Sequence, residues 1–255
     1  MLRIGNLDSR FFAACLIAWL AVSIGTGYAA DGTAVVTKLD GKATAYAKGK
    51  KVGAALHKND HVGKGQEIKV GERSRVELRF PDGTVMRFAE RSTVKMDDIA
   101  YDETTRDKKM RVDMAGGKLW ANVRRLVTSD SRVEVKTVNA VAGVRGTVYR
   151  VNVDEDNSAM VKVYDGSVYV DGRQQGTGSQ AAPAGPPVEV AGPHEVPPPY
   201  HEVSMEEWHV IVKSFQQITI SPQGVASKPE DFTPQQDMDD WVKWNQERDK
   251  QLTRE

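Results

Sequence analysis

Few residues in this sequence have the type and spacing that metal chemistry needs, and those few lie in turn-forming stretches. His57 and His61 stand four positions apart, but Asn59 and Asp60 between them are typical of a turn. We therefore interpret the two histidines as part of a polar loop rather than as a zinc site. The acidic run 154–157 carries oxygen ligands of the kind that calcium prefers, yet nothing in it fixes their geometry. We interpret it as a solvated turn between strands, and we expect no bound metal or cofactor.

Acyl, phosphoryl and glycosyl transfer each need a recognisable arrangement of residues, and the sequence offers none of them. No serine occupies a nucleophile elbow, and no glycine-rich phosphate loop precedes a helix. The adjacent carboxylates Asp97 and Asp98 are of a kind common on protein surfaces. The single cysteine, Cys15, lies in an apolar N-terminal stretch. We therefore predict that the protein is not an enzyme and has no catalytic residue.

One arginine interrupts an apolar, strand-forming stretch, residues 138–153. Arg145 lies between Gly143 and Gly146 in this stretch. Glycine permits a sharp change of direction, and a guanidinium in apolar surroundings needs hydrogen-bond acceptors. We therefore predict two strands joined by a structural corner at Arg145, Gly146 and Thr147, with Arg145 buried and bonded to backbone carbonyls. An exposed Arg145 that contacts a partner or an anionic ligand is the alternative.

The elements that would position these residues are β-strands. Between residues 34 and 170, apolar and polar residues alternate, as in Val76–Phe80, which places one face on a core and the other in water. Asp-Gly pairs at 82–83 and 165–166 are typical of tight turns between strands. No long helical pattern intervenes, so parallel strands joined by crossover helices are not expected. The sequence predicts a mainly β domain, a coiled sheet in which similar corners recur as in a β-solenoid.

The first 30 residues have the order of a secretory signal peptide. Arg3 and Arg10 flank the start of an apolar stretch, Phe11–Ile24, and small residues follow it. We expect cleavage near Ala29 or Ala30, export to the periplasm and no stable membrane span afterwards. An uncleaved membrane anchor is the alternative. The chain has 35 basic and 35 acidic residues, a balance that argues against a nucleic-acid partner.

Composition changes after the strand-forming region. Residues 172–203 hold seven prolines and are predicted to form a linker, because proline cannot donate a hydrogen bond to a sheet. Residues 204–255 favour a short appendage of two helices, the second opening on a capping box at Thr233–Gln236. Two short helices cannot bury three tryptophans alone, so these side chains must face the β domain or a partner. The candidate interaction residues are Trp208, Trp241 and Trp244.

The strand-forming region, residues 33–171, resembles the FecR domain family. The corner Val144–Thr147 with a valine-rich strand after it is similar to that family's signature. Further pieces that follow the family's order are Gly41, Leu56, 63–65, Val76–Val85, Ser92–Val94, Val135–Thr137 and 163–166.

This resemblance implies a β-rich, coiled-sheet domain outside the cytoplasmic membrane. The founding members of the family pass a signal from an outer-membrane receptor of siderophore uptake to a sigma factor. Because the signal-like segment opens the sequence, we expect an exported FecR-domain protein lacking the cytoplasmic sigma-factor-binding segment.

We expect a binding or scaffold module of the bacterial cell envelope. Its role would be protein–protein interaction in envelope signalling or assembly, with another envelope protein as its partner. Strand edges and the tryptophan-bearing helices would be its contact surfaces. Binding of a cell-envelope polysaccharide is the alternative, which burial of the tryptophans against the β domain would weaken.

Overall fold

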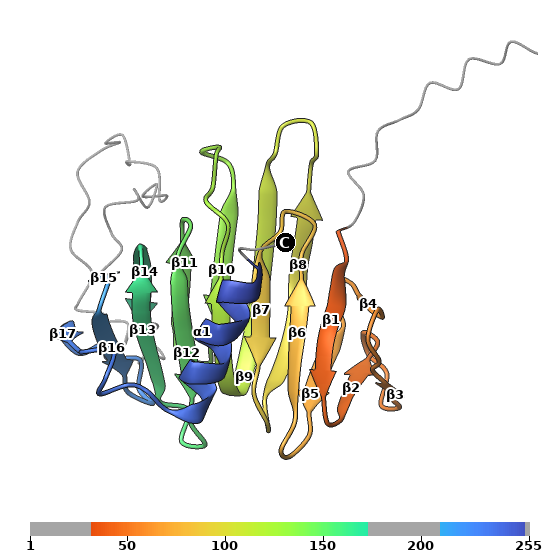
Figure 1. The fold of residues 1–255 in the computed structure, drawn as a ribbon, viewed down its shortest axis with the longest axis horizontal. Coiled ribbons are helices and arrows are strands. Elements are labelled where there is room, and N and C mark those ends of the chain that lie inside the picture. The colour runs from red at the N-terminus through yellow and green to blue at the C-terminus, as the bar shows by residue number, and fades with distance from the viewer. Residues whose placement is uncertain (1–31, 173–209, 253–255) are drawn as a thin grey trace, which may run out of the picture.

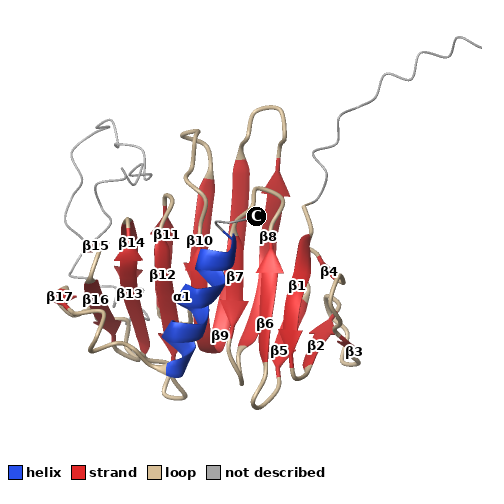
Figure 2. Cartoon of the chain, viewed as in Figure 1, coloured by secondary structure: helices blue, strands red, loops and turns tan. Residues whose placement is uncertain are grey.

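A computed structural model describes residues 32–172 and 210–252, which form a β structure with one C-terminal helix (Figure 1, Figure 2). The strands are connected into one continuous sheet that is not closed, and the chain folds this sheet into two layers. The predicted mainly β class is confirmed. A β-solenoid is not confirmed, because strand pairs in the described ranges are antiparallel except for β9 with β10. The expected signal peptide, residues 173–203 of the expected linker, and Trp208 lie outside the described residues.

Nine strands form each layer, and one strand, β9, contributes to both. The helix-bearing sheet has the order β4 (His61–Val62), β1 (Ala34–Asp40), β6 (Arg75–Arg79), β7 (Val85–Phe88), β9 (Lys108–Asn122), β12 (Val148–Val153), β13 (Ala159–Asp165), β16 (Gln216–Ile220) and β17 (Glu230–Asp231). The second sheet has the order β3 (Ala54–Ala55), β2 (Ala43–Tyr46), β5 (Glu67–Val70), β8 (Thr93–Tyr101), β9, β10 (Arg132–Lys136), β11 (Ala140–Val144), β14 (Ser167–Gly172) and β15 (Val210–Lys213).

Strand β9 crosses between the two layers at a pair of glycines. Its first half pairs with β8 and β10 in the second sheet, and its second half pairs with β7 and β12 in the helix-bearing sheet. Gly117 has a φ of +97°, and a Cβ added there would lie 2.5 Å from the Cα of Ser92. Only glycine fits such a close approach at positive φ.

Apolar side chains from both sheets form one buried core. Leu78 and Phe88 enter it from the helix-bearing sheet, and Ile68 and Val94 enter it from the second sheet. The period-two alternation of the strands explains this arrangement, because every second side chain points between the layers. The alternate side chains of the helix-bearing sheet point outward, and those of its middle strands lie beneath the helix.

The first of the two helices predicted within residues 204–255 is not found at residues 210–220. Residues 210–220 instead form β15 and β16, which pair with β14 and β13. Val212 and Ile220 are buried in the core, while Ile211 is half exposed. The edges of β13 and β14 offer unpaired backbone groups, and β-branched residues satisfy these edges better as strands than as a helix.

The second predicted helix exists but begins later than expected. The capping-box hydrogen bonds form, with the Thr233 amide donating to Gln236 Oε1 at 2.9 Å, but they close an isolated turn. Helix α1 (Asp240–Leu252) starts after Asp239, whose Oδ1 accepts from the Val242 amide at 2.7 Å. The appendage therefore has one helix among the described residues, and that part of the chain holds no helix long and apolar enough to cross a membrane.

Candidate interaction face

Helix α1, drawn in blue in Figure 1, lies against the outer face of the helix-bearing sheet. Five side chains from five strands form a line beneath it, here called the cross-strand row. Strand register makes each of them the neighbour of the next. The members of the row, in order, are Glu77, Arg87, Trp120, Arg150 and Lys162. Charged groups are rarely buried in this way unless they are paired.

At one end of the row, Glu77 and Arg87 are paired and have no exposed side-chain surface. Arg87 Nε donates to Glu77 at 2.6 Å, and Arg248 of α1 donates to the same carboxylate at 2.8 Å. Arg87 Nη1 also lies 2.8 Å from the Asp249 carboxylate. Thr37 donates a further hydrogen bond to Glu77 at 2.7 Å. Two arginines and two carboxylates therefore neutralise one another between the sheet and the helix.

At the other end, Asp237 is buried and accepts from three side chains of the sheet. Arg150 Nη2 donates at 2.6 Å, Lys162 Nζ donates at 2.7 Å, and the Tyr164 hydroxyl donates to the other oxygen. Arg150 Nη1 also contacts Asp239 at 3.3 Å. Burial and the hydrogen bond to Asp237 raise the pKa of Tyr164, so its hydroxyl remains a neutral donor.

Aromatic rings fill the middle of the interface. Trp120 Nε1 donates to Asp249 at 2.9 Å, and its ring lies 4.5 Å from that of Tyr164. Trp241 and Trp244 are stacked at 5.4 Å, and Trp241 is buried in a small apolar cluster with Trp120. Two of the three candidate tryptophans, Trp241 and Trp244, thus pack against the β domain rather than facing a partner.

The charge state of Glu77 depends on these contacts. Burial alone would raise its pKa, but hydrogen bonds from Arg248, Arg87 and Thr37 outweigh burial and lower the pKa to about 2 from 4.5. Glu77 is therefore ionised in the folded protein at every pH above about 2.

Acidification is expected to weaken the fold through Glu77. The pKa of Glu77 is lower in the folded than in the unfolded protein, so ionised Glu77 contributes to the free energy of unfolding. This contribution, about 3 kcal/mol in total, is present above about pH 4.5 and is lost as the pH falls towards 2. Urea unfolding at pH 7, 4.5 and 3 measures this loss. A Glu77→Gln variant that shows the same decline as wild type between pH 4.5 and 3 would contradict the assignment.

Asp237→Asn is expected to loosen α1. The amide leaves Arg150 and Lys162 without their shared charge partner, at a cost of about 2 kcal/mol. Hydrogen exchange should show the α1 amides exchanging faster, with little change in β10 and β11. Asp240→Asn is the matched control, because that carboxylate is exposed at the first turn of α1. Equal exchange in the two variants would contradict the anchoring role of Asp237.

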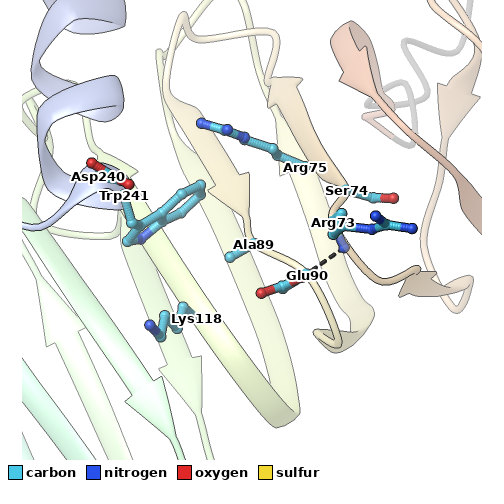
Figure 3. Close-up of a pocket in the computed structure, with 8 residues that line it drawn as sticks. All are labelled: Arg73, Ser74, Arg75, Ala89, Glu90, Lys118, Asp240 and Trp241. Atoms are coloured by element: carbon cyan, nitrogen blue, oxygen red, sulfur yellow. Dashed lines mark hydrogen bonds between the residues drawn. The ribbon is translucent and has the colours of Figure 1, made fainter.

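A cavity of about 320 Å³ lies beside the first turn of α1, with Trp241 on one wall and Glu90 across from it (Figure 3). Its charges are mixed, and Glu90 accepts from the Arg73 amide at 2.6 Å. The lining does not indicate one class of ligand. The residues around it are Arg73, Ser74, Arg75, Ala89, Glu90, Lys118, Asp240 and Trp241.

The predicted corner lies between β11 and β12, where the chain passes from the second sheet to the helix-bearing sheet. Gly146 has a φ of +82°, and a Cβ there would lie 2.7 Å from the Cα of Arg125. Thr147 is buried, and its Oγ1 donates to the Ser167 carbonyl at 2.9 Å. The prediction that Arg145 is buried is wrong, because its side chain is exposed. The outside of a corner leaves a guanidinium hydrated, which avoids the cost of burying its charge.

The cross-strand row was not found from the sequence. A signal was present, because Glu77, Arg87 and Arg150 are each flanked by large apolar residues on both sides. Arg150 even lies in the stretch 138–153 that drew attention to Arg145. Alternation alone places such residues on the solvent side of a strand, and only the helix above them makes them buried.

The remaining sequence candidates lie at the surface. His57 and His61 are exposed, and His57 Nδ1 lies 3.6 Å from Asp60. The acidic run 154–157 is the turn between β12 and β13, as predicted. Within the described ranges, no group of three or more His, Cys, Asp or Glu residues is placed to hold a metal ion.

Comparison with known proteins supports the family resemblance. Residues 66–169 match the family model described as FecR protein, and all five residues of the cross-strand row lie inside that range. Two crystal structures of a candidate anti-sigma factor from Parabacteroides distasonis ATCC 8503 are similar at 22% and 21% identity, each with a TM-score of 0.42. Each match covers 66% of this chain and 61% of that protein, which is less than two thirds of its length. A search of curated proteins found no match.

Proposed function

We propose that this protein, with a FecR domain at residues 66–169, is a non-enzymatic binding module that acts through protein–protein interaction in envelope signalling or assembly. The observation that carries the proposal is that the β structure already holds a protein segment on one face. Residues 237–252, here called the C-terminal segment, bind there through paired charges and stacked rings. A face built to hold a peptide in this way suits a protein partner.

The FecR family is regulatory rather than catalytic, which supports a role without enzymatic turnover. Export is part of the proposal and rests on the order of basic, apolar and small residues in the first 30 positions. Fusing residues 1–35 to a reporter enzyme that is active only outside the cytoplasm tests it. An inactive fusion in cells would contradict export.

Polysaccharide binding is the alternative function, and no arrangement of side chains within residues 32–172 and 210–252 favours it. A glycan platform needs exposed aromatic rings along one face, whereas Trp120 and Trp241 are buried. Trp244 is half-buried, with the Arg75 guanidinium 4.8 Å from its ring. These rings hold the C-terminal segment in place.

Affinity capture with the chain from residue 31 onward, from the envelope fraction of its own cells, tests the proposed function. Photo-reactive residues placed at exposed positions, such as Ile211 on the edge strand β15, would identify by cross-linking which positions contact the partner directly. We expect specific protein cross-links at defined positions. Retention on envelope glycan without any protein cross-link would contradict the proposal and favour the polysaccharide alternative.

A further inference from the structure

We infer that the outer face of the helix-bearing sheet is a recognition surface for acidic helical segments. The C-terminal segment occupies this surface as an intramolecular competitor of a partner segment with the same chemistry. This inference rests on the proposed function and names the surface and the kind of partner that would serve it.

The first support is the charge pattern of the interface. The sheet supplies three cations, Arg87, Arg150 and Lys162, to the carboxylates of Asp237 and Asp249 of the segment. One pair has the opposite polarity, because Glu77 of the sheet pairs with Arg248 of the segment. The segment is therefore recognised by its acidic groups at both ends. A buried ion pair adds little net free energy beyond its cost of desolvation, so such contacts specify position more than they hold the segment irreversibly.

The second support is that the segment leaves donors of the interface unpaired. On the sheet side, Arg87 Nη2 and Arg150 Nε are buried and have no hydrogen-bond partner in the described part of the chain. Each buried donor without an acceptor costs free energy relative to a partner that could supply one. A segment with better placed acceptors would therefore compete successfully.

The third support is the separation of the interface from the main core. Trp241 and Val242 pack with Ala89 and Trp120 in a small cluster that is distinct from the core between the sheets. Strand β16 is not equivalent to α1, because Ile218 and Ile220 of β16 belong to the main core. Helix α1 can therefore leave the face without opening the core.

Geometry limits what the partner segment can be. Helix α1 has 13 residues and is about 20 Å long at 1.5 Å per residue. A matching partner is therefore a helix of about three to four turns, with one carboxylate just before its start and another in its last turn.

A labelled synthetic peptide of residues 233–252 is the probe for this surface. Fluorescence anisotropy would compare its binding to the full wild-type chain and to an Asp237→Asn, Asp249→Asn chain with a weakened segment. We expect the variant to bind the peptide at least tenfold more tightly, because its own segment no longer competes effectively. The Asp240→Asn chain is the control and should bind like wild type. Equal binding by the weakened and wild-type chains would overturn the inference.

A second peptide tests whether charge is what the face recognises. In it, Asp237, Asp239 and Asp249 are replaced by Asn, and its binding to the weakened chain should be at least tenfold weaker. Equal binding of both peptides would overturn recognition by carboxylates.

A third test measures hydrogen exchange in the wild-type chain and therefore does not depend on the folding of any variant. The amides of α1 should exchange at least tenfold faster than those of β12, because the helix leaves the face while the sheet persists. Equal exchange would show that α1 opens only with the whole fold and would overturn the competition.

Failure of this inference is separable from failure of the proposed function. An envelope protein that cross-links equally to the wild-type and weakened chains leaves the proposed function standing and overturns the competition at this face. A dimer that forms from the weakened chain and dissociates when the peptide is added would identify a second copy as the occupant and overturn the assignment to another partner.

Discussion

Glu77→Ala is expected to lower the free energy of unfolding by about 3–5 kcal/mol, because it leaves buried cations without their shared counter-ion. Glu77 is fully buried and accepts from Arg87, Arg248 and Thr37. Removing its carboxylate leaves Arg87 between the sheet and α1 with only the partners that the helix supplies. Urea unfolding at neutral pH measures the loss, and α1 should become more exchangeable in the same variant.

Glu72→Ala is the matched control for this experiment. Glu72 pairs with Arg91 at 3.1 Å, but both side chains are largely exposed. Glu72→Ala should therefore change the free energy of unfolding by less than about 1 kcal/mol. A loss at Glu77 no larger than the loss at Glu72 would show that the buried network does not stabilise the fold.

Gly117→Ala is expected to destabilise the protein by about 3–5 kcal/mol, from a strained backbone and a steric overlap together. The residue has positive φ, and the added Cβ would meet the Ser92 backbone where β9 changes sheets. Rotation of the Ser92 side chain could move its Oγ, which lies 2.3 Å from the added Cβ, but it could not move the Ser92 Cα at 2.5 Å, so the strand itself must move.

The neighbouring glycine provides an internal comparison. A Cβ on Gly116 would meet nothing within 4 Å, and this residue does not have positive φ. Gly116→Ala should therefore change the free energy of unfolding by less than about 1 kcal/mol. Thermal unfolding of both variants measures the two losses of stability. Similar losses at Gly116 and Gly117 would contradict the crossing geometry described for β9.

Much of the β structure was accessible from the sequence, because period-two alternation directly reports which side chains share a face of a strand. The alternation at 76–80 became β6, the turn at 154–157 joined two strands, and the corner near Gly146 formed between β11 and β12. Local chemistry also predicted hydrogen bonds correctly at Thr233–Gln236, although the helix began elsewhere.

The errors arose where distant strands set the outcome. Residues 210–215 have a spacing compatible with a helix, but the open edges of β13 and β14 take up this part of the chain as a strand pair. The similar Asp-Gly turns at 82–83 and 165–166 also diverge. The first joins two strands of one sheet, and the second carries the chain from one sheet to the other.

The sequence by itself determined the mainly β class and the corner near Gly146, since each depends on residues close together in the chain. The order of short motifs along residues 33–171 indicated the FecR resemblance. Only the tertiary structure decided which arginines are buried. Arg145, isolated between glycines, is exposed on a corner, whereas Arg87 and Arg150 lie beneath α1. The reason is that strand order brings residues 77, 87, 120, 150 and 162 into one row, and the helix from the far end of the chain then excludes water from it.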